Sequence, residues 1–352
     1  MVISKASNLP KVIGGLFGLG TPKIDSVAGL PPFLHSEALL MVNARSCLFA
    51  ALRVARAART WMPSFLCPSV ISAVKAAGSE ICFYRVDNSL QVTDDKFLNE
   101  LHAGDAFLFI NFFGFPGAAD IATRAREFGA VVIEDASQSL LTPPSINLAD
   151  FLIYSPRKFL GVIDGGVLLG NCDLITSIEK LEPPNSHWLE LAAKSAAARA
   201  KFDAGEGDNH WFEAFQWAEE NAPIGHFRIS ELSRALLSSA FDYDAFAQAR
   251  QRNFRTLLDL FPKSSLFKDL PERIIPLGFP MVISERDSIQ KHLAEKRIYA
   301  PVHWRIDGFV PPKFENSHAL SRSILTLPCD QRYDSDDMIR IANELNLLGI
   351  GE

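Results

Sequence analysis

The sequence has few of the features that mark several large classes of protein. Its 352 residues include five cysteines, and none of them stands in a CxxC pair. Scattered cysteines in an odd number argue against a disulfide framework and against a zinc site, and they are typical of a reducing compartment. The net charge is −6 without a run of like charge. The chain therefore lacks the basic stripe that a nucleic-acid-binding protein carries.

Long apolar runs are also missing. The most conspicuous one, Ala106 to Phe113, contains Asn111 and has less than half the length of a membrane-spanning helix. Near the start, one lysine precedes a short apolar stretch that Pro10 and several glycines interrupt, which is not the pattern of a signal peptide. We therefore expect a cytoplasmic protein that binds neither membrane nor nucleic acid.

What the chain does contain is an alternation of short apolar strands and amphipathic helices, which follows an irregular stretch over 1–40 and an alanine-rich helical stretch from Ala44. The predicted strands are Glu80–Arg85, Ala106–Phe112, Ala130–Ile133, Phe151–Tyr154 and Gly166–Leu169. The predicted helices are Ser69–Ala77, Asp94–Leu101 and Asp120–Phe128. Strands separated by helices of this length favour right-handed crossovers, so we expect an α/β fold with a mainly parallel central sheet.

The alternation stops in the second half of the chain. Residues 178–221 are helical in composition and are interrupted by Pro183-Pro184 and by a glycine-rich turn at 205–208, as expected of a connector. Beyond it we predict a helix over about 229–260, a strand within 274–283, and helices over about 287–296 and 335–347. These patterns predict a large α/β domain over 1–220, which includes the connector, and a smaller α+β domain over 221–352.

The segment Glu134-Asp135-Ala136-Ser137-Gln138 directly follows an apolar strand. Asp135 is therefore expected at the carboxyl end of a strand, the edge at which open α/β sheets bind ligands. In one interpretation its carboxylate caps a helix or is solvated in a loop. In the other, it pairs with the protonated ring nitrogen of a pyridine cofactor and keeps that ring an electron sink.

Lys158 supports the second interpretation. It follows the strand Phe151–Tyr154 by a few residues and precedes the pair Gly165-Gly166, which allows a sharp turn close to a ligand. A lysine that is buried near another cation has a lowered pKa and supplies the neutral amine that Schiff-base chemistry needs. A lone lysine is more often a surface charge, so the inference depends on its spacing from Asp135.

With these two residues in place, the chain resembles the DegT/StrS family of pyridoxal-phosphate (PLP)-dependent sugar aminotransferases. The resemblance extends over most of the chain. The segments that carry it are VIGGLFGLG at 12–20, NARSCLFAAL at 43–52, INFFGFPGAADIATRAREFGAVVIEDASQS at 110–139, PIGHFRISELSRALL at 223–237, HW at 303–304 and LTLP at 325–328. It implies fold type I, the aspartate-aminotransferase-like fold, with a smaller α+β C-terminal domain.

The resemblance also implies roles for individual residues. Lys158 would hold PLP as an internal aldimine and then move a proton as general acid and base. Asp135 would pair with the ring nitrogen, and Gln138 would lie beside the ring. The phosphate would bind Ser46 and the backbone amides of Arg45–Cys47, where a helix N-terminus also favours an anion. Taken alone, Ser46 is better explained as a simple helix N-cap.

Several positions depart from the family pattern. Where members place an aromatic side chain over the cofactor ring, this chain has Cys67, with Phe65 two residues earlier, so either Phe65 stacks on the ring or the ring is covered differently. Ser155 stands nearer to the lysine than the family's phosphate-binding serine. His226 replaces the asparagine that the neighbouring subunit contributes, as alignment on Arg228 indicates.

The resemblance implies an aminotransferase that moves an amino group from a donor such as glutamate to a keto sugar, linked to a nucleotide, within a homodimer that shares its active site. His303, Trp304 and Arg228 are candidate substrate contacts, although a packed core pair explains His303 and Trp304 equally well.

One alternative function is that of a related sugar dehydratase, in which histidine replaces the lysine. The other is that of a PLP-binding regulator without activity. The GGLFGLG stretch at 14–20 is no NAD site, because no clear strand precedes it and no acidic residue follows at the right distance.

Overall fold

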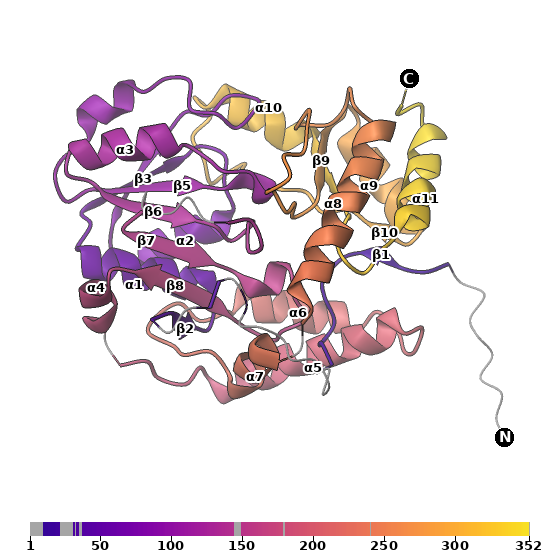
Figure 1. Ribbon diagram of the computed structural model, residues 1–352, viewed down its shortest axis with the longest axis horizontal. Helices are drawn as coiled ribbons and strands as arrows, with labels where there is room; N and C mark the ends of the chain where they lie inside the picture. The colour runs from indigo at the N-terminus through magenta and orange to yellow at the C-terminus, as the bar shows by residue number, and fades with distance from the viewer. Residues whose placement is uncertain are drawn as a thin grey trace.

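A computed structural model of the chain describes residues 10–21, 31, 33–34, 37–143, 149–178, 180–239 and 241–351. Its largest element is a seven-stranded sheet in the order β2-β8-β7-β6-β5-β3-β4 (Figure 1). The strands are β2 (Leu39–Met41), β3 (Arg59–Pro63), β4 (Glu80–Tyr84), β5 (Ala106–Ile110), β6 (Val131–Asp135), β7 (Phe151–Tyr154) and β8 (Gly166–Gly170).

The central strands of this sheet run parallel, as the sequence predicts. Strands β3 to β7 form parallel neighbours throughout, whereas β8 pairs antiparallel with both β7 and β2. Every residue of β5 is buried, because helices cover both faces of a parallel sheet and leave its strands no solvent-facing side. The register places Asp135 opposite Ile110 on one side and Ile153 on the other.

Helices connect and flank the strands. In chain order they are α1 (Ala44–Ala55), α2 (Pro68–Ala77), α3 (Ala119–Glu127), α4 (Cys172–Thr176), α5 (Ser186–Asp203), α6 (Trp211–Glu220), α7 (Glu231–Ser239), α8 (Tyr243–Leu260), α9 (Arg286–Glu295), α10 (Glu315–Ser323) and α11 (Ser335–Asn346). Short 3-10 turns are η1 (Lys96–Glu100), η2 (Phe112–Gly114) and η3 (Pro156–Lys158). No helix in the ranges that the structure describes is long and apolar enough to cross a membrane.

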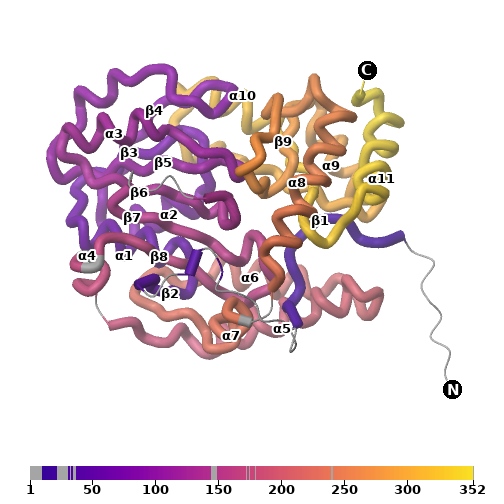
Figure 2. Tube along the Cα trace, viewed as in Figure 1, coloured from indigo at the N-terminus to yellow at the C-terminus, as the bar shows by residue number. Residues whose placement is uncertain are grey.

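The C-terminal elements build a second core beside the sheet (Figure 2). Strands β9 (Phe279–Val282) and β11 (Ile324–Leu327) pair antiparallel, and α8, α9 and α11 pack their apolar faces around them. The chain's first described strand joins this part, since β1 (Ile13–Gly14) pairs with β10 (Ile298–Tyr299). The segment before the large sheet thus reaches across the molecule to its other end.

Two of the predicted helices differ from the structure. The single helix expected over 229–260 is instead α7 and α8, and Asp242 caps the start of α8 by accepting a hydrogen bond from the Ala245 amide at 3.0 Å. The helix expected over Asp94–Leu101 is only the 3-10 turn η1. Strand β3 was not predicted, because its sequence Arg-Thr-Trp-Met-Pro has a charged start and a terminal proline.

The connector expected over 178–221 contains α5 and α6, which pack together through Trp188, Ala192 and Ala218. Ile229 and Leu237, which follow it, are buried with Phe159 against the large sheet. The division into domains at residue 220 stays a prediction.

Candidate active site

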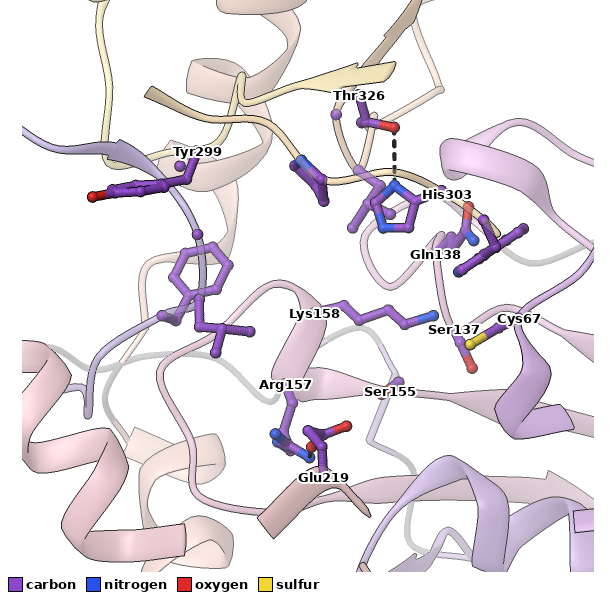
Figure 3. A pocket seen from close by; sticks show the side chains of 18 of the residues that line it. Cys67, Ser137, Gln138, Ser155, Arg157, Lys158, Glu219, Tyr299, His303 and Thr326 are labelled. Atoms are coloured by element: carbon purple, nitrogen blue, oxygen red, sulfur yellow. Dashed lines mark hydrogen bonds and ion pairs between the residues drawn. The ribbon is translucent and has the colours of Figure 1, made fainter. Parts of the chain in front are cut away.

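A cavity of about 970 Å³ lies at the carboxyl ends of β5, β6 and β7 (Figure 3). The sheet, the connector helices and the C-terminal elements all contribute to its walls. Eight of the predicted site residues line it: Arg45, Cys67, Asp135, Gln138, Ser155, Lys158, His303 and Trp304. In open α/β sheets this edge is where ligands bind, so the cavity is the candidate active site.

Asp135 enters the cavity because it ends β6. Its neighbour Glu134 faces the other side of the sheet, where Asn111 donates a hydrogen bond to Glu134 Oε1 at 2.6 Å. The Oδ1 atom of Asp135 accepts a hydrogen bond from the Ser137 amide at 2.9 Å, which orients the carboxylate at the strand end. Ile110 and Ile153, its partners on the two flanking strands, also line the cavity.

Lys158 ends the turn η3, directly after β7. The turn is closed by the Lys158 amide, which donates to the Ser155 carbonyl at 3.2 Å. Figure 3 shows the Lys158 side chain extended across the cavity, with its amine toward Ser137 and Cys67. The amine from one strand end and the carboxylate from the neighbouring strand end therefore face one cavity.

Gln138 stands beside them and is almost completely buried. Its Oε1 accepts a hydrogen bond from the Phe113 amide at 2.5 Å, within the turn that follows β5. Because Oε1 is engaged, Nε2 is the end of this side chain that can donate to a ligand.

The N-terminus of α1 forms the cavity's floor next to the glycine pair. Asn43 caps the helix by accepting a hydrogen bond from the Ser46 amide at 2.9 Å. A Cβ on Gly166 would lie 2.4 Å from the carbonyl carbon of Asn43, and Gly165 has a φ of +139°. Only glycines allow this close approach and this turn. The pair that follows Lys158 therefore packs against the helix end and does not line the cavity.

An ion-pair cluster at this helix end was missed by the sequence analysis. Arg157 Nη1 lies 2.6 Å from Glu219 Oε1, and Arg45 Nη2 lies 3.7 Å from Glu219 Oε2. Burial acts to raise the pKa of Glu219, but the positive charges of Arg157, Arg45 and Lys158 outweigh burial and leave this pKa lowered. Figure 3 shows Arg157 and Glu219 facing each other on the cavity wall.

His303 lies on the opposite wall, where its Nδ1 is 2.9 Å from the hydroxyl oxygen of Thr326 in β11 (Figure 3). Burial, and after it the positive charge of Lys158, lower the pKa of His303 to about 3. The ring is therefore neutral at physiological pH, and its edge-on contact with Trp304 has a centroid separation of 5.5 Å.

This buried neutral histidine predicts a pH dependence of stability. Between pH 6.5 and about 3 the unfolded chain binds a proton at His303 and the folded chain does not. The free energy of unfolding therefore falls as the pH falls, by about 2 kcal/mol between pH 7 and pH 5. In urea denaturation, we expect the free energy of unfolding of the His303→Gln variant to fall over this interval by about 2 kcal/mol less than that of the wild type. Equal losses in both proteins would contradict the assignment of a neutral imidazole.

Three predicted cofactor contacts lie outside the cavity lining. Ser46 is fully buried, and its hydroxyl donates to the Pro223 carbonyl and accepts from the Gly225 amide, both at 3.3 Å. Cys47 is fully buried in the main core, where burial and the charge of Asp135 raise the pKa of its thiol. Phe65 is also fully buried, with its ring centroid 5.5 Å from that of Trp304. Trp304 lines the cavity and Phe65 does not, so stacking of Phe65 on the cofactor stays a prediction.

His226 and Arg228 do not line the cavity either. The His226 ring packs edge-on against Phe49 of α1, with centroids 5.2 Å apart. Arg228 is half exposed and lies 4.0 Å from Glu231. Their predicted roles, in cofactor and substrate binding, stay predictions.

The connector helices supply a wall that the sequence did not predict. Arg199 of α5 is almost fully buried, donates to the Gly14 carbonyl at 2.9 Å, and lies 4.7 Å from the Trp211 ring centroid. Phe17, Trp211 and Phe215 line this side of the cavity. These three aromatic residues form a wall of the cavity and are remote in sequence from Lys158.

Comparison of the sequence with known proteins finds no matching family model and no matching curated protein. Solved structures do match. They include a DegT DnrJ EryC1 StrS aminotransferase from Brucella abortus, with 18% identity, a TM-score of 0.63 and coverage of 92% of this chain and 87% of the other. DesI, solved in the presence of its TDP-sugar product, matches with 19% identity, a TM-score of 0.66 and coverage of 92% and 83%. The putative sugar aminotransferase Spr1654 from Streptococcus pneumoniae matches with 14% identity, a TM-score of 0.66 and coverage of 97% of both chains.

This chain has their fold. The predicted α/β architecture with its mainly parallel sheet is confirmed, and it is that of the fold type I aminotransferases. The resemblance that the sequence indicated is thus confirmed at the level of the fold. Sequence identities below 20% show a shared fold and do not show a shared reaction. The function therefore has to follow from the residues of the site.

Proposed function

We propose that the protein is a PLP-dependent aminotransferase. The observation that supports this most directly is the convergence of the Lys158 amine and the Asp135 carboxylate on one cavity, from the ends of neighbouring parallel strands. PLP chemistry needs both groups, an amine to hold the cofactor's aldehyde carbon and a carboxylate to keep its ring nitrogen protonated.

The rest of the cavity also fits this cofactor. Gln138 offers a donor amide beside the Asp135 strand end. At the α1 end, Arg45 and Arg157 already hold a carboxylate, that of Glu219, which indicates that this end accepts an anion such as a phosphate. An amine, a carboxylate and an anion-binding end are the three contacts that PLP requires.

In this proposal PLP supplies the electron sink that stabilises negative charge on the substrate's carbon. Asp135 holds the proton at the ring nitrogen by a charge-assisted hydrogen bond. Lys158 Nζ would take a proton from the substrate carbon that carries the amino group and deliver it to the carbon that was the cofactor's aldehyde, as a 1,3-shift requires. His303, neutral and bound to Thr326, forms the opposite wall without adding a second positive charge next to the amine.

The proposed acceptor is a keto sugar, with an amino acid such as glutamate as the donor. The cavity volume of about 970 Å³ is large enough for a sugar that carries a nucleotide. Its far wall contains Phe17, Trp211 and Phe215, on which a base ring can stack. DesI, which shares the fold, was solved in the presence of a TDP-sugar product, which supports this substrate class.

We also propose a homodimer. His226 and Arg228 do not line the cavity of their own chain. If they contact cofactor or substrate, as the family pattern implies, they do so in the cavity of a second copy.

A spectral titration tests the proposed reaction. Protein reconstituted with PLP is mixed with single amino acids, and the visible band of the lysine-bound cofactor is followed. We expect at least one donor, glutamate first, to convert this band to that of pyridoxamine phosphate and to yield one equivalent of the 2-oxo acid. A stable band that no amino acid discharges would favour the alternative, a PLP-binding regulator without activity. A deoxygenated sugar product without amino transfer would favour a dehydratase, which Lys158 argues against.

A further inference from the structure

Glu219 lies at the end of α6, and its carboxylate projects onto the cavity wall beside Arg157 (Figure 3). Two arginines hold it. Arg157 makes a short ion pair at 2.6 Å, and Arg45 contacts both the carboxylate at 3.7 Å and the Glu219 backbone carbonyl at 3.1 Å. The side chains of the two arginines are 22% and 17% exposed, so water screens these contacts only in part.

The two arginines belong to the elements that frame the cofactor site. Arg45 is the second residue of α1, at the positive end of the helix dipole. Arg157 immediately precedes Lys158 in η3. Two arginines thus stand at one end of the cavity next to the lysine, and the carboxylate of Glu219 pairs with both of them.

We propose that Glu219 is an internal ligand of this anion-binding end, and that the phosphate of the cofactor has to displace its carboxylate in order to bind. This inference rests on the proposed function, because it assigns the phosphate of PLP to the end formed by Arg45 and Arg157. Glu219 then sets how tightly the cofactor is held and favours its release.

Charge explains why the two anions compete. A phosphate monoester carries between one and two negative charges near neutral pH and has three acceptor oxygens. It pairs bidentately with an arginine as a carboxylate does and has a further oxygen for the second arginine, but it cannot share the site with a second anion without strong repulsion. The alternative role for Glu219 is to position the two arginines, in which case its removal weakens phosphate binding.

Two ligands separate these roles, PLP and pyridoxal, which differ in the phosphate. Each is titrated into wild type, Glu219→Gln and Glu219→Ala while the visible band is followed. The account predicts that both substitutions tighten PLP by about tenfold and leave the affinity for pyridoxal unchanged. Glu220→Gln, an exposed neighbour on the same helix, is the matched control and keeps both wild-type affinities.

A second measurement is independent of Lys158 chemistry. Thermal unfolding with increasing inorganic phosphate should show a larger upward shift of Tm for Glu219→Gln than for wild type, because the anion site is open. A phosphate effect of this kind without any visible band in any of the proteins would refute the proposed cofactor and with it the competition with PLP, and would leave only the role of Glu219 as an internal ligand of the anion site. A visible band in wild type with equal or weaker PLP binding in both variants would overturn the inference and leave the proposed function in place.

Discussion

Lys158→Ala is expected to abolish both the visible absorbance of bound PLP and amino transfer, with a fall in turnover of at least about 10³-fold. The reason is that the side chain performs two tasks that no neighbour can take over. It would hold the cofactor's aldehyde carbon, and it would move the proton from the substrate carbon to that cofactor carbon in the 1,3-shift. The side chain crosses the cavity from η3 toward Ser137 and Cys67, so its removal leaves an opening in the site (Figure 3).

The matched control for this variant is Lys75→Ala. Lys75 is an exposed lysine of α2 that does not line the cavity. It should leave absorbance, turnover and Tm at their wild-type values. If Lys158→Ala kept normal turnover, the assignment of the cofactor lysine would be wrong, whatever its effect on stability.

Asp135→Asn is expected to leave PLP attached and to lower kcat by about 10- to 150-fold, which corresponds to the loss of a charge-assisted hydrogen bond worth about 1.5–3 kcal/mol. Asparagine has the same shape, and its Oδ1 can still accept the 2.9 Å hydrogen bond from the Ser137 amide. The local fold is therefore preserved, and the change isolates the negative charge that keeps the ring nitrogen protonated.

The measurement is single-turnover conversion of the bound cofactor by the amino donor, together with the visible spectrum before donor is added. The account requires a retained band with slow conversion. Unchanged conversion in Asp135→Asn would show that the carboxylate does not act on the ring, even though it lies in the same cavity as Lys158. Asp135→Glu keeps the negative charge on a side chain that is one methylene longer, and it should convert the bound cofactor faster than Asp135→Asn and more slowly than the wild type.

The central part of this site could be predicted because its residues depend on local pattern. An apolar strand that ends in Asp135, and another that is followed closely by Lys158, place both residues at one edge of a parallel sheet, whatever the rest of the chain does. The adjacent glycines were also predicted as a sharp turn. The structure adds that residue 166 has to be a glycine, because the backbone of Asn43 lies against it and leaves no room for a Cβ.

The surroundings could not be predicted in the same way, because they depend on contacts between segments far apart in the sequence. Phe65 was a candidate to cover the cofactor, but its ring is fully buried and packs against Trp304, a residue more than 200 positions later. Glu219 lies in a segment interpreted only as a connector. Nothing in its local sequence indicates that α6 brings its carboxylate to Arg157 and Arg45.

The predicted helix over 229–260 shows a related limit. Both α7 and α8 have helical patterns, and the sequence between them contains neither the glycine nor the proline that usually marks a break. The chain turns there because Leu236 and Leu237 pack against the large sheet and Phe254 and Leu257 pack in the C-terminal core. The N-cap Asp242 is the one local signal of this break, and the packing of the two helices in different cores is contained in no local window.

Reductive trapping tests the central claim most directly. The protein is incubated with PLP, reduced with borohydride, digested, and the modified peptide is identified by mass spectrometry. The account predicts a single phosphopyridoxyl group on Lys158, at one equivalent per chain. Modification of Lys291, the lysine of α9 at the cavity's other side, or no modification above that of the Lys158→Ala variant, would contradict it.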